Sequence, residues 1–189
     1  MKRLLLAVAA ITLFIPVACA QEHGQAAARP EPPGFKWFTY TSPEGRYSIS
    51  MTEAPKLTTQ NSTGASGDAF VQYMAAVSAD PAYLMVGYFD YPQGVTFSLD
   101  AARDGMVNSL HGNLLDEDSI SLGGSPGRAI KIAAKTDAGV DFIDRARFYD
   151  INRRIYVVQC LVPVNNEGAK AIQICNQFFD SFRVKNSQN

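Results

Sequence analysis

Four strand-like runs in the second half of the chain are separated by joints of only a few residues. The runs are SISL, RAIKIAAK, VDFIDRARFY and RIYVVQCLV, and the joints are GGSPG, TDAG and DINR. Such joints, rich in Gly, Asp, Asn and Pro, are typical of tight turns. A parallel crossover needs a dozen or more residues, so these joints restrict neighbouring strands to antiparallel pairing. The chain must therefore build much of its core on an antiparallel sheet.

Further strand-like runs occupy the first half of the chain. They are FKWFTY, RYSISM, AFVQYMAAV and YLMVGYFDY. Pro43 and Gly45 favour a turn between the first two, and Asp80 followed by Pro81 favours a turn between the last two. The segment TTQNSTGASGD is polar and contains glycine, which predicts a loop or a weak edge strand.

One amphipathic helix is expected in the middle of the chain. Ser98 is a good N-terminal cap, and Asp100 suits the positive end of the helix dipole. Apolar residues recur at three- and four-residue steps from Leu99 to Leu110, and Gly112 can end the helix.

A second helix is expected near the C-terminus, beginning at Asn165 or Asn166. Its apolar stripe is Ala171, Ile172, Cys175, Phe178, Phe179 and Phe182. Helices with such stripes cover the apolar faces of a sheet. The sequence therefore predicts an α+β domain in which an antiparallel β-sheet is flanked by helices.

The N-terminus has the pattern of an export signal. Lys2 and Arg3 precede an apolar run of signal-peptide length, and Ala18-Cys19-Ala20 fits the small-x-small cleavage rule. We expect residues 1–20 to be a signal peptide and the mature protein to be periplasmic or secreted.

A lipoprotein is the alternative interpretation of the same segment. Cys19 would then be lipidated, and the protein would be anchored at the membrane. Pro16 stands where lipoprotein signals carry an aliphatic residue, which favours soluble export. A membrane is therefore expected as a partner only if Cys19 is lipidated.

Composition divides the remainder of the chain. Residues 21–34 are rich in Pro and Ala and predict a flexible tether, residues 35–185 predict one folded domain, and residues 186–189 predict a disordered tail. Removing residues 1–20 leaves 15 of the 17 basic residues and all 18 acidic ones, so the net charge is 15 − 18 = −3. This balance argues against nucleic acid as a partner.

Two of the three cysteines remain after cleavage, Cys160 and Cys175. An exported compartment is oxidising, and an even pair of cysteines favours a disulfide there. Cys160 lies in a strand-like run and Cys175 in the last helix, so a helix that folds back on its preceding strand would bring them together. Two buried, unreacted thiols are the alternative.

The residues Gly123–Gly127 match the pattern G-x-S-x-G of a serine-hydrolase nucleophile elbow. That elbow needs a helix after the serine and an N–H donor on the next residue. Here a strand-like run follows Ser125, and the next residue is Pro126, which has no N–H. We interpret the segment as a hairpin turn and expect no catalytic residue and no cofactor.

His111 and the acidic run from Asp116 to Asp118 do not have the pattern of a metal site. His111 stands at the end of the first helix, where the dipole favours an imidazole. Asp116, Glu117 and Asp118 lack EF-hand spacing, and a solvated loop is expected. No metal site is predicted.

A group of arginines is the best surface candidate in the sequence. Two-residue spacing places Arg145 and Arg147 on one sheet face beside Tyr149. The candidate surface for an anion or an acidic partner comprises Arg128, Arg145, Arg147, Arg153 and Arg154. The alternative is a solvated sheet face on which Lys131 pairs with Asp144 across strands.

Several stretches together resemble one family. They are YTSPEGRYSISM, LDAARDGMVNSLHGNLL, ISLGGSPGRAIKI, RARFYDINRRIYVVQC and FFDSFRV. In this order they resemble the PsbP-like superfamily, particularly DcrB-like bacterial exported proteins, from Trp37 to Val184. The resemblance implies an α-β-α sandwich and a partner-binding module, with no shared catalytic residue.

Two functions are therefore expected as alternatives. The first is a non-enzymatic, exported protein-interaction or assembly module whose partner is an unknown envelope protein. The second is a small-ligand or lipid carrier with a pocket between sheet and helix, lined by residues such as Trp37, Tyr88 and Tyr91.

Overall fold

The computed structural model describes residues 36–63 and 69–185. The expected signal peptide, the tether, Cys19 and the C-terminal tail lie outside the described residues. Within the described ranges the chain forms ten strands in two antiparallel sheets, two α-helices and one 3-10 helix. No helix in these ranges is long and apolar enough to cross a membrane.

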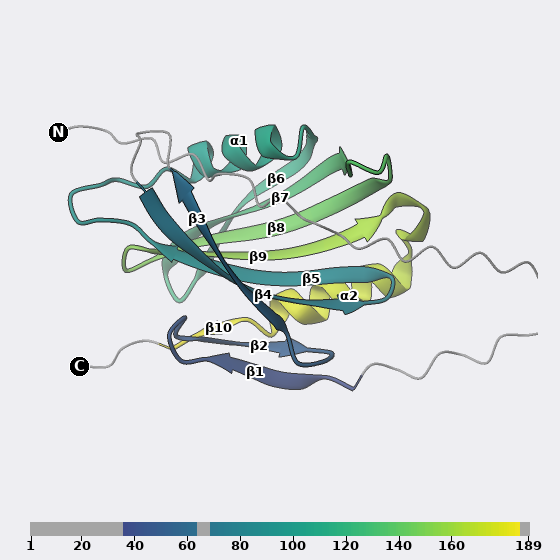
Figure 1. Cartoon of the computed structure of the whole chain (residues 1–189), viewed down its shortest axis with the longest axis horizontal. Coiled ribbons are helices and arrows are strands. Elements are labelled where there is room, and N and C mark those ends of the chain that lie inside the picture. Colours follow the sequence, from purple (N-terminus) through teal and green to yellow (C-terminus); the bar gives the residue numbers. More distant parts are fainter. Residues whose placement is uncertain (1–35, 64–68, 186–189) are drawn as a thin grey trace, which may run out of the picture.

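The larger sheet has seven strands in the order β3-β4-β5-β9-β8-β7-β6 (Figure 1). The strands are β3 (Lys56–Thr63), β4 (Ala69–Ala79), β5 (Ala82–Asp90), β6 (Asn113–Leu122), β7 (Ser125–Lys135), β8 (Asp141–Ile151) and β9 (Arg154–Pro163). Every neighbouring pair is antiparallel, which confirms the pairing predicted from the short joints. β9 lies at the centre and is buried over nearly its whole length, as its apolar sequence requires.

Tight turns set the register of this sheet. Gly123 and Gly124 both have positive φ, 58° and 82°, and join β6 to β7 in a two-residue hairpin. Asn152 and Arg153 do the same between β8 and β9, with φ of 53° and 63°. The sequence around Ser125 is therefore a hairpin turn, as predicted.

A second sheet of three strands was not predicted. It contains β1 (Phe38–Ser42), β2 (Tyr47–Met51) and β10 (Arg183–Val184), in the order β1-β2-β10. The sequence predicted one continuous sheet, and β1 and β2 are instead a separate hairpin. β10 is only two residues long and gives no sequence pattern, but its pairing with β2 joins the two ends of the domain.

The two helices cover opposite faces of the seven-stranded sheet (Figure 1). α1 (Leu99–Ser109) begins as predicted, with the Ala101 N–H donating to the Ser98 hydroxyl at 3.2 Å. α2 (Ala169–Asp180) lies on the other face beside the three-stranded sheet, and it begins later than predicted. The residues Val164–Asn166 form the 3-10 helix η1 instead, and Gly168 caps α2.

Gly112 has a different role from the predicted helix cap. His111 takes the left-handed conformation that ends α1, with φ of 47°. A Cβ on Gly112 would lie 2.6 Å from Ile132 Cγ2 and 2.9 Å from the Ala133 carbonyl oxygen. Gly112 therefore lets the chain pass close to β7 as it leaves the helix.

Each face of the large sheet buries its own core. The core under α1 includes Phe89, Ala102, Met106, Ile132 and Phe148. The core on the other face includes Tyr47, Val86, Tyr156, Cys175 and Phe178. Phe182 is also buried here as predicted, although it follows the end of α2, while Ile172 is exposed.

The disulfide predicted between Cys160 and Cys175 is confirmed. It joins β9 to α2 with a Cα–Cα distance of 5.6 Å, and both residues are fully buried. The bond fixes the helix to the central strand of the sheet, inside the core that also holds Tyr47.

Candidate functional site

The acidic run at Asp116 to Asp118 lies in edge strand β6, not in the solvated loop that the sequence predicted. Side chains alternate along a strand, so Glu117 points to the opposite face from its two neighbours. An edge strand tolerates this charge because much of it remains exposed. Among the described residues, no group of three or more His, Cys, Asp or Glu side chains is arranged to hold a metal ion.

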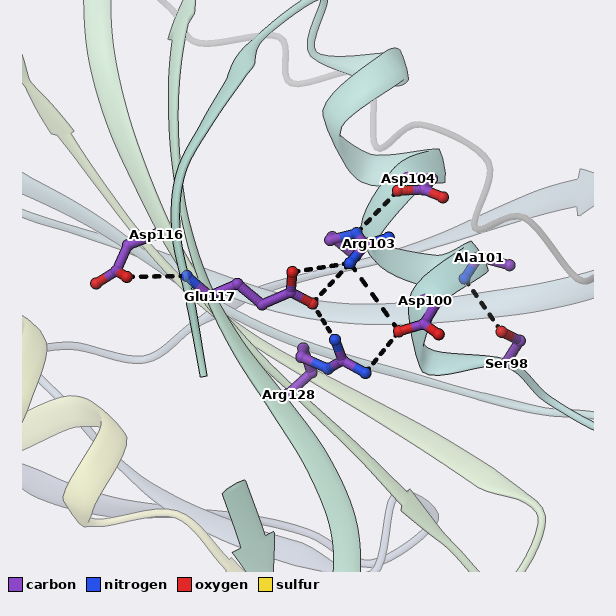
Figure 2. Close-up of polar contacts among 8 residues, drawn as sticks. All are labelled: Ser98, Asp100, Ala101, Arg103, Asp104, Asp116, Glu117 and Arg128. Atoms are coloured by element: carbon purple, nitrogen blue, oxygen red, sulfur yellow. Dashed lines mark hydrogen bonds and ion pairs between the residues drawn. The ribbon is translucent and has the colours of Figure 1, made fainter. Parts of the chain in front are cut away.

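Glu117 is the centre of an ion-pair network that fixes the start of α1 (Figure 2). Arg103 donates to both carboxylate oxygens of Glu117 at 2.8 Å, and Arg128 donates to one of them. Arg128 also donates to Asp100 at 2.6 Å, and Arg103 to Asp104 at 2.8 Å. The nearby carboxylates of Asp104 and Glu117 raise the pKa of Arg103, so its charge is permanent.

The structure divides the five candidate arginines among separate places. Arg128 is paired under α1, as described above. On the opposite face Arg145 pairs with Glu167, and Arg147 lies over the Phe179 ring at 4.6 Å and 3.4 Å from Asp180. The pKa of Glu167 is lowered despite its partial burial, because Arg145 and Lys131 stabilise the carboxylate.

Lys131 and Asp144 do not form the cross-strand pair expected as the alternative. Lys131 pairs with Glu167 at 3.3 Å, whereas Asp144 points to the other face and is fully buried under α1. Asp144 accepts a hydrogen bond from Gln159 Nε2 at 2.8 Å. Burial raises the pKa of Asp144 to about 7.

Arg154 has a structural role that sequence analysis did not assign. Its guanidinium binds both oxygens of Asp90, at 2.6 and 2.7 Å, and donates to the Glu44 carbonyl oxygen at 2.6 Å. The same group lies 4.5 Å from the centre of the Tyr88 ring. Arg154 therefore joins the β1–β2 turn to the large sheet, and hydrogen bonding to it lowers the pKa of Asp90.

A second contact supports the same turn. The Tyr156 hydroxyl donates to the Gly45 carbonyl oxygen at 2.8 Å. The Gly45 N–H donates to the Ser42 hydroxyl at 3.0 Å, and a Cβ on Gly45 would lie 2.5 Å from the Tyr47 ring. The turn is consequently fixed to the large sheet by two buried side chains of β9.

A groove of about 410 Å³ lies between this anchored hairpin and the outer strands of the large sheet. We call it the tyrosine groove. Its lining residues are Tyr40, Ser42, Glu44, Tyr47, Leu57, Thr58, Thr59, Tyr73, Met74, Ala75 and Tyr88. Strands from both sheets contribute, so the groove exists only because the two sheets meet here.

The tyrosine side chains form one continuous aromatic surface. Tyr73 stacks on Tyr88 with 4.9 Å between ring centres and 12° between planes. The Tyr47 ring meets the Tyr88 ring edge-on with 6.2 Å between centres, and it lies tilted to the Tyr40 ring at 6.1 Å. Burial raises the pKa of Tyr40, Tyr47 and Tyr88, so their hydroxyls remain neutral donors and acceptors.

The outer wall of the groove is apolar and exposed. Leu57 on β3 is 64% exposed and Tyr73 on β4 is 42% exposed. Val71, two residues before Tyr73 and on the same face of β4, is 38% exposed. Both β1 and β3, which line the groove, are edge strands of their sheets. Exposed apolar residues that lie together beside a groove make it a candidate binding surface.

The pocket predicted for a carrier is only partly matched. Tyr88 lines the tyrosine groove, but the groove lies between two sheets and not between a sheet and a helix. Tyr91 lies on the α1 side, where it stacks on Phe97 and donates to Asp150 at 3.0 Å. Trp37 packs against the core of the groove side and does not line the groove.

The sequence predicted Tyr88 as a pocket residue but not its meeting with Tyr40 and Tyr73. Tyr40, Tyr73 and Tyr88 come from three strands whose relative positions depend on the second sheet. The signal that was present is the alternation in β4, where Val71 and Tyr73 occupy the exposed positions. Two neighbouring apolar residues at such positions on an outer strand make that face a candidate contact surface.

Comparison with solved structures shows that the chain has a PsbP-like fold. No protein-family model matches the chain, and no curated protein sequence matches it. The solution structure of cyanobacterial PsbP (CyanoP) from Synechocystis sp. PCC 6803 is similar with a TM-score of 0.55 and 12% identity, over 85% of this chain and 98% of that one. A Pseudomonas aeruginosa protein of unknown function, PA94, described as a putative regulator, has a TM-score of 0.39 and 13% identity, over 75% of this chain and 94% of that one.

Proposed function

We propose that this chain, which has a PsbP-like fold, is a non-enzymatic, exported protein of the DcrB-like kind that binds another protein in the periplasm or at the cell envelope. The tyrosine groove is the proposed binding surface. The observation that carries the proposal is the aromatic lining of this groove together with its exposed apolar wall at Leu57 and Tyr73.

The groove has the features of a protein-binding surface. Tyrosine supplies a large contact area and a polar hydroxyl while losing little conformational entropy on binding. Arg154 and Tyr156 hold the hairpin that forms one wall, so the groove is organised before a partner arrives. Most other charged clusters in the described part of the chain are satisfied internally, as in the network around Glu117.

Export is supported by two separate features. Residues 1–20 have the sequence pattern of an export signal. The buried disulfide between Cys160 and Cys175 is of a kind that persists in oxidising compartments.

A carrier for a small ligand or lipid is the second candidate. Its support is the groove volume of about 410 Å³, which falls in the range of small-molecule pockets. The exposed wall favours the first candidate, because a carrier buries most of its ligand in a concave site.

Native mass spectrometry of the protein purified from its own cells under non-reducing conditions tests the proposal. We expect a protein partner bound to the wild-type chain and lost from the variant Tyr73→Arg, which places a charge on the groove wall. A matched variant, Leu115→Arg on the distant edge strand β6, should retain the partner. A small molecule lost with Tyr73→Arg would move the function to the carrier, and a partner retained by that variant would exclude the groove.

A further inference from the structure

We propose that the partner binds the tyrosine groove through an extended segment that carries a lysine or arginine side chain, which pairs with Glu44. This binding mode rests on the proposed function and adds the chemistry of the partner to it. Three properties of the groove support it: its charge, the position of β1 and β3 at the ends of the two described sheets, and the arrangement of its apolar wall.

The charge of the groove is negative. Among the described residues that line it, Glu44 is the only charged one. No hydrogen bond or ion pair joins its carboxylate to a described residue, and its backbone carbonyl alone is bound, by Arg154. The positive charge of Arg154 is already neutralised by Asp90. A cationic side chain is therefore the complement that this groove lacks.

The carboxylate of Glu44 acts on the tyrosines of the groove. Burial raises the pKa of Tyr40 and of Tyr88, and the charge of Glu44 adds to the effect in both. The Glu44 carboxylate is therefore close enough to act electrostatically on both Tyr40 and Tyr88. A basic side chain placed there would meet a carboxylate and aromatic rings together, which is a favourable environment for a cation.

The strand edges favour an extended segment. Among the described residues β1 pairs with β2 alone and β3 with β4 alone, so each is the last strand of its sheet there. The outer edge of such a strand can accept a further strand. Natural proteins protect such edges with charges or prolines. β3 carries one charge, Lys56, at its first position, and alternation directs Lys56 away from the groove side where Leu57 lies. An added strand from a partner would satisfy one of these edges.

The apolar wall fits the aliphatic part of a basic side chain. Long basic side chains lay their methylene groups on apolar surface and keep the charge at its rim. Leu57 and Tyr73 provide that surface in this groove, and Glu44 provides the charge. An apolar residue next to the basic one in the partner would contact the same wall.

A random library of 12-residue peptides displayed on phage, selected against the full chain, tests the binding mode. Selected sequences should be enriched in Lys or Arg next to an apolar residue. The variant Glu44→Gln should weaken a selected peptide about tenfold, the effect of one ion pair of moderate strength. Glu53→Gln, an equal charge change outside the groove lining, should leave the affinity within about twofold, since exposed charges contribute little.

The peptide supplies a second measurement. Replacing its basic residue with norleucine should weaken binding to the wild-type chain and have little further effect on Glu44→Gln, because the two changes remove the same interaction. Independent, additive effects of the two changes would overturn the pairing with Glu44.

The remaining outcomes separate this inference from the proposed function. Selected peptides that lack basic residues but lose binding with Tyr73→Ala would overturn the cationic segment and leave the groove as a protein-binding site. Peptides unaffected by Tyr73→Ala would overturn both. Saturable binding of choline, with no peptide selected, would overturn the extended segment and favour the carrier.

Discussion

The two faces of the seven-stranded sheet differ in how completely they are covered. On one face α1 closes over its core, and the pairs of Arg103 and Arg128 with Glu117 fix the start of the helix to β6 and β7. On the other face α2 and the three-stranded sheet cover β5 and β9 but stop at the edge strand β1. Beyond β1 the outer strands are left with exposed Leu57 and Tyr73.

Under the proposed function, the two faces of the sheet have different roles. The face under α1 includes a fully buried acid, Asp144, and a helix held by ion pairs, so it contributes mainly to stability. The groove face contains the disulfide that joins α2 to β9, and the Arg154 anchor that fixes the hairpin wall of the groove to the large sheet. Substitutions on the first face should therefore change stability alone, whereas those on the second should also change binding.

The largest expected effect is a pH dependence that originates under α1. Asp144 has a pKa of about 7 in the folded protein, above the ordinary carboxyl value, so the folded state holds its proton at a pH where the unfolded state has lost it. The stabilisation from protonated Asp144 is complete below about pH 4 and declines up to about pH 7, by roughly 4 kcal/mol in total. Urea unfolding of the wild-type chain and of Asp144→Asn from pH 4 to pH 8 measures it.

The asparagine variant isolates this contribution. Gln159 and Met106 contact each other beside Asp144, and Arg145, on the opposite face and paired with Glu167, is the charged group that acts on it. The difference in unfolding free energy between variant and wild type should grow with pH in favour of Asp144→Asn. Parallel curves would show that Asp144 is already ionised at pH 4.

Removal of the disulfide is expected to have the next largest effect. The bond closes a loop between residues 15 positions apart, and the chain-entropy estimate for such a loop is about 3 kcal/mol. The double variant Cys160→Ala, Cys175→Ala should lose that stability and no longer respond to reductant. Equal stability of the reduced and oxidised wild-type protein would contradict this role.

Loss of the Arg154 anchor should affect both stability and the groove. Arg154→Met removes charge-assisted hydrogen bonds to Asp90 and Glu44, with an expected cost of roughly 2 kcal/mol. Its control is Arg147→Met, whose exposed ion pair with Asp180 should contribute under about 1 kcal/mol. Denaturant unfolding gives the free energies, and amide exchange should rise in β1 and β2 only for Arg154→Met.

The smallest expected effect is on the ion-pair network of α1. Glu117→Gln weakens contacts with Arg103 and Arg128 that are partly exposed, so the loss of stability should be about 1 kcal/mol or less and should shrink at high salt. Binding at the tyrosine groove should not change. A loss of partner binding in Glu117→Gln would contradict the claim that the face under α1 contributes to stability alone.

Local patterns predicted most of the large sheet. The joint at Gly123 and Gly124, the cap at Ser98 and the cysteine pair all act over short distances or through chemistry that the sequence displays. These features were confirmed because the same residues that give the pattern also make the contacts.

The second sheet and the groove could not be predicted in the same way. β10 has two residues, and its pairing with β2 joins Arg183 to Ser48 across most of the domain. The polar sequence of β3 has no alternating apolar pattern because much of that strand is exposed at an edge. The groove is lined by residues of the second sheet and of β3, so its residues come together only through long-range contacts.

Site-specific photo-crosslinking in living cells tests the central claim most directly. A photoreactive phenylalanine replaces Leu57 on β3 or Leu115 on β6, two exposed leucines at opposite edges of the large sheet. We predict one discrete crosslinked protein from position 57, lost when Tyr73→Arg is added, and none from position 115. Crosslinking from position 115 alone, or equally from both positions, would contradict the assignment of binding to the tyrosine groove.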